Sequence, residues 1–483
     1  MDIVFSTFNA RYSHTALALR CLRANLGGLH DHSVIVEFDN SISPQAAAEK
    51  LLTHDPTIIL FSIYIWNLIV TYETVAILRT LRPDIKIVVG GPEVSYIYDD
   101  LLIYPLIDHL VCGEGEEVIE KLCRDLLAGG KAPKVIEALP ADLKTIALPY
   151  DEYTNADIAH RRIYVETSRG CPFKCEYCLS AIEQGVRFFP PDRIFPEFKK
   201  LIERGVRIFK FLDRSFNINA AHAAAVLRFF LENRRDGMML HLEWEPDHLP
   251  PTLEKLLAEA PIGFMQLEVG VQTFNTEVSA RIDRPLNAER VKAHIRTLAA
   301  MPSVHLHADL IAGLPGETLE SISSGFDRLH ACGPDEIQLG ILKKLRGTPL
   351  ARHDVEWQMV YNTSPPYDVL QTSSLTFIEL QNIRRFARFW DITVNNGRFP
   401  HSSPLIWQNQ PSVFAAFMGW SRWVYEQTHA TFGFTPTRLA QLLEEFLTGP
   451  RGLSAKTVRH AIESDLVARA AGAKGMERQT RKR

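Results

Sequence analysis

The sequence predicts an α/β protein in which a parallel sheet, a partial (β/α)6 barrel and a small, mainly helical region follow one another. Short apolar runs alternate with segments whose apolar residues recur every three or four positions, over the N-terminal third and again from Arg162. Alternation with short connections is typical of right-handed βαβ units in parallel sheets. Beyond about residue 385 this alternation stops and aromatic residues become dense.

Length, charge and cysteine content limit the class of protein. The 483 residues are enough for two or three domains, and the formal net charge of −4 gives no general attraction to nucleic acid or membranes. Seven cysteines in so long a chain do not indicate a disulfide scaffold. The first residues lack the basic and long apolar regions of a signal peptide, and the apolar run 58–70 is too short to span a bilayer. We therefore expect a cytoplasmic protein without a membrane span.

The N-terminal segment, residues 1–134, is predicted to be a five-stranded, flavodoxin-like (Rossmann-like) domain. The expected strands are 3–8, 34–38, 58–65, 85–89 and 109–112, with helical segments such as 15–26, 44–52 and 71–81 between them. In this architecture ligands bind beyond the carboxyl ends of the strands. The loops expected there contain polar residues and adjacent glycines, which let a ligand approach the backbone closely: Asn9, Ser62, Gly90, Gly91, Glu93 and Glu114.

A second α/β region follows a predicted linker, residues 135–156, which contains Pro140 and Pro149 without sustained periodicity. Residues 157–385 are expected to contain six strand–helix units, with strands at 163–167, 208–212, 240–244, 265–270, 305–310 and 336–342. Six such units form a partial barrel, whose chemistry lies at the carboxyl ends of the strands. Polar residues and glycine-containing loops occur there: Asp213, Ser215, Glu268, Gln272, Gly313 and Leu314.

Three cysteines follow the first strand of this barrel in the pattern CxxxCxxC: Cys171, Cys175 and Cys178. Three thiolates on one tight loop can bind one corner of an iron–sulfur cluster and leave the fourth iron open to a substrate. Zinc is the main alternative, but structural zinc needs four closed ligands, and no second pair of cysteines follows nearby. The spacing therefore favours a cluster.

This pattern, with Tyr177 before the last cysteine, resembles the cluster motif of the radical S-adenosylmethionine (SAM) enzymes, and the resemblance covers residues 157–385. It implies a [4Fe-4S] cluster on Cys171, Cys175 and Cys178, whose unique iron is chelated by the amino and carboxylate groups of SAM. It also implies cleavage of SAM to a 5′-deoxyadenosyl radical. The SAM contacts that it implies are Tyr177, Asp213, Ser215, Glu268, Gln272, Gly313 and Leu314.

The N-terminal domain resembles the cobalamin (B12)-binding domain, because Ser62-Ile63-Tyr64 precedes Gly90-Gly91 in that family's order and spacing. The stretch Gly113-Glu114-Gly115-Glu116 is similar to the same domain when it is fused to radical SAM enzymes. The implied cobalamin contacts are Asn9, Ser62, Gly90, Gly91, Glu93 and Glu114. The family's Asp-x-His-x-x-Gly stretch is absent, although His14 lies close to its position. We therefore expect no histidine ligand on cobalt, and ligation by His14 is the open alternative.

The C-terminal segment, residues 386–472, is rich in large aromatic residues such as Phe386, Trp390, Phe417 and Trp420. A helical domain packed around them is favoured over an aromatic substrate lid or nucleobase-stacking surface, because large aromatics mostly fill cores. Helices are expected at 435–447 and 454–470, and the basic tail 473–483 is expected to be disordered. The region resembles the uncharacterised C-terminal domain of some cobalamin-dependent radical SAM proteins.

These observations together predict a cobalamin-dependent radical SAM enzyme that methylates an unactivated carbon. Cobalamin-assisted cyclisation or rearrangement is one alternative. An RNA methylthiotransferase is another, but it needs a second cluster, and Cys21, Cys112 and Cys123 are interpreted as small buried hydrophobes. A cobalamin sensor without enzymatic activity would not explain the three clustered cysteines.

The partners follow from this predicted function. The sequence does not identify the substrate: a small molecule or natural-product precursor is favoured, with RNA as the alternative. An external electron donor such as a flavodoxin or ferredoxin is expected to reduce the cluster.

Overall fold

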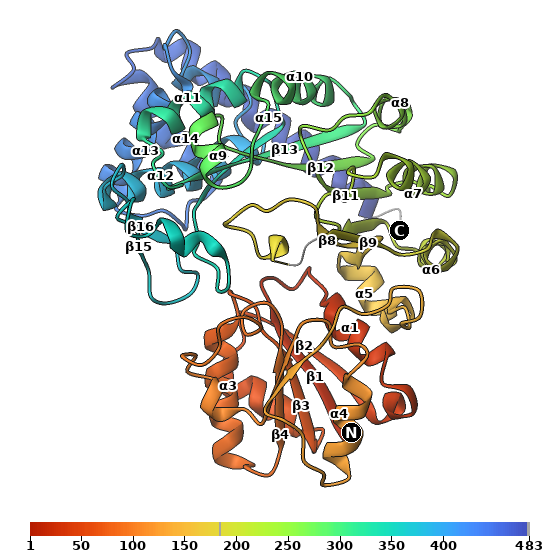
Figure 1. The fold of residues 1–483 in the computed structure, drawn as a ribbon. Coiled ribbons are helices and arrows are strands. Elements are labelled where there is room, and N and C mark those ends of the chain that lie inside the picture. Colours follow the sequence, from red (N-terminus) through yellow and green to blue (C-terminus); the bar gives the residue numbers. More distant parts are fainter. Residues whose placement is uncertain (183–184, 481–483) are drawn as a thin grey trace. The chain divides into compact units, whose positions relative to one another are not determined.

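The structure is a computed structural model that describes residues 1–182 and 185–480, with side chains up to residue 467 (Figure 1). The chain forms two compact units. The first consists of Met1–Leu267, Lys343–Ala351 and Asn362–Asp368; the second consists of Glu268–Leu342, Arg352–Tyr361 and the chain from Val369 onward. The division passes through a single strand, β12 (Met265–Gln272).

The first unit begins with a parallel sheet in the order β2-β1-β3-β4-β5-β6. Its strands are β1 (Ile3–Asn9), β2 (Ser33–Asp39), β3 (Ile58–Ser62), β4 (Lys86–Gly90), β5 (His109–Cys112) and β6 (Val135–Glu137). The first five confirm the flavodoxin-like prediction. Strand β6 corrects it, because it lies where a linker was predicted and pairs with β5 at Leu110↔Val135. Three residues are too few to show a periodic pattern.

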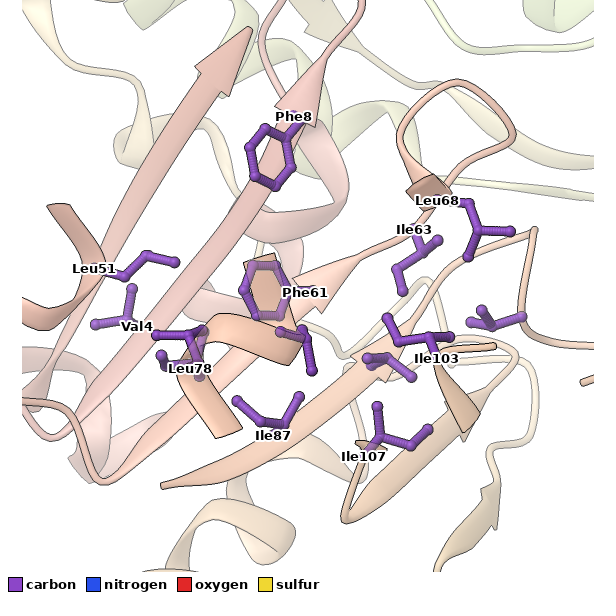
Figure 2. Packing of buried hydrophobic residues seen from close by; sticks show 14 of the residues in the cluster. Val4, Phe8, Leu51, Phe61, Ile63, Leu68, Leu78, Ile87, Ile103 and Ile107 are labelled. Carbon is purple, nitrogen blue, oxygen red and sulfur yellow. The ribbon is translucent and has the colours of Figure 1, made fainter. Parts of the chain in front are cut away.

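Helices cover both faces of this sheet: α1 (Leu17–Ala24), α2 (Pro44–Leu52), α3 (Leu68–Leu81) and α4 (Ile119–Leu127) (Figure 1). Side chains of β1 alternate between the two faces of the sheet. Val4 and Phe8 pack in one apolar cluster, and Ile3 and Phe5 pack in another. Figure 2 shows the first cluster, in which side chains from strands and helices converge. A parallel sheet with two buried faces explains why its strands appear in the sequence as continuous apolar runs.

The rest of the first unit contains the beginning of the barrel. Helix α5 (Asn155–His160) precedes β7 (Ile163–Val165), and an antiparallel hairpin, β8 (Ser168–Cys171) with β9 (Gly185–Phe188), follows it. Strands β7, β10 and β11 are parallel neighbours, in the order β7-β10-β11. The remaining elements are α6 (Pro191–Glu203), β10 (Ile208–Phe211), α7 (Ala220–Glu232), β11 (Met239–Trp244) and α8 (Pro251–Glu259). The hairpin was not predicted from the sequence.

The second unit continues the strand–helix alternation with α9 (Thr276–Arg281), α10 (Ala288–Ala299), β13 (Val304–Ala312), α11 (Leu319–His330) and β14 (Glu336–Ile341). Strands β13 and β14 are parallel, with His307 opposite Glu336. The six barrel strands, β7 and β10 to β14, occur in the sheet in their sequence order. This order confirms the prediction of six strand–helix units.

The C-terminal part of the second unit is mainly helical. After the short pair β15 (Val360–Tyr361) and β16 (Val369–Gln371) come α12 (Phe377–Trp390), α13 (Val413–Thr428), α14 (Pro436–Thr448) and α15 (Ala455–Thr480). The rings of Phe386, Trp390 and Phe417 contact one another and are buried, which supports the packed-core interpretation. Residues 473–480 of the predicted disordered tail belong to α15, and residues 481–483 lie outside the described residues.

Single turns of other helix types complete the secondary structure. The 3₁₀ segments are Gly27–His32, Tyr104–Leu106, Tyr150–Glu152, Leu179–Ala181, Pro349–His353 and Ser403–Ile406, and a π-helical turn is formed by Asp391–Asn395. Among the described residues, no helix combines the length and the apolar character that crossing a membrane requires.

Candidate functional site

The three clustered cysteines lie on a loop that the β8–β9 hairpin closes. Cys171 is the last residue of β8 and pairs with Gly185 of β9. Cys175 is buried, Cys171 and Cys178 are half-buried, and the Cys178 amide donates a hydrogen bond of 3.0 Å to the Cys175 carbonyl. Within the described part of the chain, no group of three His, Cys, Asp or Glu residues is arranged to hold a metal ion. The three thiols share one loop.

The chemistry of this donor set nevertheless fits an iron–sulfur cluster, because three sulfur ligands lie on a single loop. The guanidinium of Arg214 is close enough to interact electrostatically with Cys178 and Cys171. Arg214 itself is held by Glu243, with 3.1 Å between Nη1 and Oε1.

Asp213 fixes the chain immediately before the cysteine loop. Its carboxylate is 1% exposed and accepts hydrogen bonds from the Thr167 amide (2.9 Å), the Thr167 hydroxyl (2.6 Å) and the Ser168 hydroxyl (2.6 Å). Burial raises the pKa of Asp213 to about 6, although these three bonds favour the ionised form. Nearby, the Ser215 hydroxyl lies 3.4 Å from the Cys171 sulfur. Both residues were predicted to contact SAM; in the structure Asp213 holds Thr167 and Ser168, at the start of β8.

A buried arginine, Arg169, lies two residues before the first cysteine and contacts three carboxylates. Its guanidinium nitrogens lie 2.8 Å from Glu114 and 2.7 Å from both Glu116 and Glu166, and the side chain is 13% exposed. Burial disfavours its charge, but the carboxylates of Glu166 and Glu116 outweigh burial and raise the pKa of Arg169. Of these four residues only Glu114 was predicted to be functional. The Gly113-Glu114-Gly115-Glu116 stretch was the available signal for Glu116, and no local pattern pointed to Arg169 or Glu166.

An apolar cavity of about 270 Å³ lies beyond the carboxyl ends of β3, β4 and β5. This is where the architecture is expected to bind a ligand. The backbone of Gly91 has a φ of +107°, and a Cβ there would lie 2.5 Å from the Ile63 carbonyl oxygen, so only glycine fits. Predicted cobalamin residues and apolar side chains line the cavity: Leu19, Leu60, Ser62, Gly90, Gly91, Val111, Glu114 and Ile119. The apolar lining suits the aromatic base of a nucleotide-like group.

A second cavity of about 450 Å³ adjoins the cysteine loop and has lining residues in common with the first. The shared residues are Tyr64, Pro92, Glu114, Glu166, Arg169 and Leu212. The second cavity also has an aromatic wall, since Trp66 stacks on Tyr64 with 4.4 Å between ring centroids. The Trp66 indole N–H donates to the Phe8 carbonyl at 3.0 Å, which fixes the ring although the residue is half-exposed.

Two other predicted cobalamin residues, Glu93 and Asn9, form hydrogen bonds within the protein. Glu93 accepts a hydrogen bond of 2.6 Å from the Tyr367 hydroxyl, and burial raises the pKa of Glu93. The Asn9 amide donates to the carbonyl of His14 (3.2 Å) and to Glu37 (3.1 Å). The imidazole Nδ1 of His14 lies 2.5 Å from the Tyr164 hydroxyl, and burial lowers the pKa of His14.

The remaining predicted SAM residues are Tyr177 on the cysteine loop and four residues of the second unit. Glu268 and Gln272 lie on β12, and Gln272 has a φ of +68°. Gly313 and Leu314 directly follow β13, and a Cβ at Gly313 would lie 2.5 Å from a methyl carbon of Val369. The backbone therefore requires glycine at position 313, whether or not a ligand is bound.

Comparison with protein families identifies three successive matches. Residues 4–123 match the B12 binding domain, residues 165–328 match the radical SAM superfamily, and residues 355–475 match a protein of unknown function, DUF4080.

Several named proteins are similar in sequence to this chain. An uncharacterized methyltransferase, PH0819, from Pyrococcus horikoshii is 24% identical over 69% of this chain and 77% of its own length. The cobalamin-dependent radical SAM methyltransferase TokK from Streptomyces tokunonensis is 26% identical over 60% of this chain, which spans 47% of TokK. An anaerobic magnesium-protoporphyrin IX monomethyl ester cyclase from Cereibacter sphaeroides is 23% identical over 77% of this chain and 66% of its own length.

Solved structures show the same fold. The radical SAM methyltransferase TsrM from Kitasatospora setae has a TM-score of 0.62 and 17% identity, covering 78% of this chain and 80% of TsrM. The cobalamin-dependent SAM radical enzyme OxsB, with aqua-cobalamin and SAM bound, has a TM-score of 0.60 and 12% identity, covering 100% of this chain and 81% of OxsB.

Proposed function

We propose that this chain, a radical SAM enzyme with a B12-binding domain and a DUF4080 domain, methylates an unactivated carbon of its substrate with the help of cobalamin. The observation that carries the proposal is the shared wall between the apolar cavity of the B12-binding domain and the cavity beside the cysteine loop. The names of PH0819 and TokK as methyltransferases support the same reaction class.

Each set of predicted binding residues has a role in the proposed reaction. Cys171, Cys175 and Cys178 would hold a [4Fe-4S] cluster, and the residues predicted to contact SAM and cobalamin, with the exception of Glu114, would bind those groups. When bound, these cofactors supply a carbon-centred radical and a transferable methyl group. The chain binds and orients them: the apolar cavity accepts the aromatic base of cobalamin, and the Tyr64–Trp66 stack offers a flat apolar surface.

The burial of the other cysteines favours a single cluster over a methylthiotransferase with two. Cys21, Cys112 and Cys123 lie within α1, β5 and α4 and are at most 5% exposed. Burial raises the pKa of Cys112 to about 11 and that of Cys123 to about 12, so both thiols stay protonated at neutral pH. Protonated, buried thiols pack as small hydrophobes and do not bind metal.

The proposed substrate is a small molecule or natural-product precursor. One relative, from Streptantibioticus cattleyicolor, is named a 2-(S-pantetheinyl)-carbapenam-3-carboxylate methyltransferase, which acts on a small molecule. RNA is the alternative, since other relatives are named tRNA-2-methylthio-N(6)-dimethylallyladenosine synthases. Cyclisation is a second candidate reaction because the cyclase relative matches 77% of this chain.

Turnover with methyl-labelled SAM separates these reactions. The full chain, reconstituted anaerobically with iron, sulfide and hydroxocobalamin, would be reduced and supplied with a small-molecule metabolite extract from anaerobically grown cells. We expect about four irons and one cobalt per chain, 5′-deoxyadenosine formation and labelled methyl groups in a product. Formation of 5′-deoxyadenosine without label in any product would favour cyclisation. About eight irons per chain would indicate two clusters and favour a methylthiotransferase. The Cys175→Ala variant is the control, and it should form no deoxyadenosine.

A further inference from the structure

We propose that Glu114 is a positioning residue for the cysteine loop, because its carboxylate bridges two arginines that face each other at the base of that loop. The two arginines are Arg169 on β8 and Arg187 on β9. This inference deepens the proposed function and rests on it in one respect: the loop must hold an iron–sulfur cluster.

The β8–β9 hairpin brings the two arginines together. Its antiparallel register places Arg169 directly opposite Arg187, two pairs away from the Cys171↔Gly185 pair that closes the cysteine loop. Two like charges directly opposite each other destabilise a pair of strands. The hairpin that defines the ends of the cluster loop therefore carries a repulsion that its own residues do not relieve.

Glu114 contacts both arginines, with one oxygen for each strand. Oε2 accepts from Nη1 of Arg169 at 2.8 Å, and Oε1 accepts from Nη2 of Arg187. Oε2 also accepts from the Ala141 amide at 2.9 Å, which fixes the orientation of the carboxylate. The arginines hold the pKa of Glu114 below its usual range, although burial acts in the opposite direction.

The other carboxylates near Arg169 cannot replace this bridge. Glu116 and Glu166 contact Arg169, but among the described residues neither of them forms an ion pair with Arg187. The side chains of Glu114 and Arg169 are 14% and 13% exposed, so solvent screens their interaction little; Arg187 is 35% exposed, so its pair with Glu114 is screened more. Removing the Glu114 charge would leave Arg169 paired but Arg187 facing it without its bridge.

A fixed base matters because three thiols on one loop must be held together to bind one corner of a cluster. Closing a loop costs less conformational entropy when its two ends are already held together. A group that supports metal ligands from outside the first coordination sphere typically affects metal affinity by roughly 10–100-fold.

Glu114 also lines both cavities, so a direct contact to cobalamin is the competing role. The two roles predict different losses. A positioning residue for the loop affects iron retention first, whereas a cobalamin contact affects cobalamin uptake first.

The test compares the Glu114→Gln variant with wild type and with Glu116→Gln, using the full, anaerobically reconstituted chain. We expect the Glu114 variant to lose iron to a chelator about tenfold faster, with an altered electron paramagnetic resonance spectrum of the reduced cluster. Its uptake of hydroxocobalamin, measured by absorbance, should stay within about twofold of wild type. Glu116→Gln, which removes a contact to Arg169 alone, should retain iron better than the Glu114 variant.

Iron retention in the double variant Glu114→Gln/Arg187→Gln is the decisive measurement. Because it removes the facing cation together with the carboxylate, it should recover part of the lost iron retention, and no recovery would overturn the proposal. Normal iron retention with failed cobalamin uptake in Glu114→Gln would also overturn it. If Glu114→Gln does not fold, Glu114→Asp applies the same test, since its shorter side chain keeps the charge but cannot bridge both arginines. Failure of the proposed function itself would appear in wild type, as absence of a cluster.

Discussion

The core of the first sheet and the base of the cysteine loop are stabilised by different kinds of interaction. Apolar side chains such as Val4, Phe61 and Ile87 fill the core, and each contacts many neighbours (Figure 2). The base of the cysteine loop is instead stabilised by a few polar pairs: Asp213 accepts a hydrogen bond from Thr167, and Glu114 forms an ion pair with Arg169. A core tolerates exchange among residues of similar size, whereas a buried polar network requires particular partners. Changes in the first region should therefore act on stability, and changes in the second should act on both stability and iron binding.

The largest expected loss of stability comes from the core. Phe61→Ala removes a side chain that is 2% exposed and leaves a cavity, which should cost about 3–5 kcal/mol of unfolding free energy. Chemical denaturation of the metal-free protein measures it, and Leu81→Ala, at a residue that is 60% exposed on the same domain, is the control. A loss no larger than that of the control would contradict the comparison.

Asp213 should make the loop base sensitive to pH. Its folded pKa of about 6 lies above the ordinary value of 3.8, so the unfolded chain loses the proton first as pH rises. Its stabilising contribution is complete below pH 3.8 and is lost as pH rises toward 6. A shift of about two units corresponds to about 3 kcal/mol.

The Asp213→Asn variant isolates this contribution, because asparagine does not titrate. Relative to wild type, the metal-free variant should gain stability between pH 4 and pH 7, as measured by urea unfolding at both values. A constant difference between the two proteins at both pH values would show that burial does not raise the pKa of Asp213.

Gly170→Ala should disrupt the hairpin that closes the loop. Gly170 has a φ of +89°, and a Cβ there would lie 2.2 Å from the carbonyl oxygen of Gly185. Backbone strain of this kind costs about 1–3 kcal/mol, and we expect iron incorporation to fall with it. Gly237→Ala is matched, because its φ is +73° and nothing lies within 4 Å of the added carbon. Equal iron contents in the two variants would separate the hairpin from cluster binding.

The smallest effect should come from an exposed ion pair in the first unit. Lys121 lies 2.6 Å from Asp125 on α4, and its side chain is 82% exposed. Lys121→Gln should change the unfolding free energy by less than about 0.5 kcal/mol and leave iron content unchanged. A larger effect in chemical denaturation would show that charge alone, without burial, stabilises this domain.

The strand–helix alternation was predictable because it depends on apolar periodicity. Helix α2 was predicted with the bounds that the structure has, and all six barrel strands were located. The short strand β6 and the β8–β9 hairpin were not, since three or four residues carry no measurable period. The hairpin also contains glycine and arginine, which are not typical strand residues.

Sequence patterns identified candidate residues that lie close together in the chain, and missed residues that pair at a distance. The spacing of Cys171, Cys175 and Cys178 identified the loop directly. Arg169 and Arg187 were missed, because their importance arises from a contact with Glu114, which is more than fifty residues away in the chain. No local pattern reports such a pairing, so the contacts of Asp213 and Glu93 with the chain became visible only in the structure.

The return of residues 362–368 to the first unit has a consequence for protein synthesis. Tyr367, whose hydroxyl satisfies the buried carboxylate of Glu93, follows it by 274 residues. At roughly 5–20 residues per second, a ribosome needs about 15–55 s to add that length of chain. During that interval the B12-binding domain can form its sheet, but the carboxylate of Glu93 lacks the hydrogen bond from the Tyr367 hydroxyl. The B12-binding domain is thus completed by a segment that is synthesised 274 residues after Glu93.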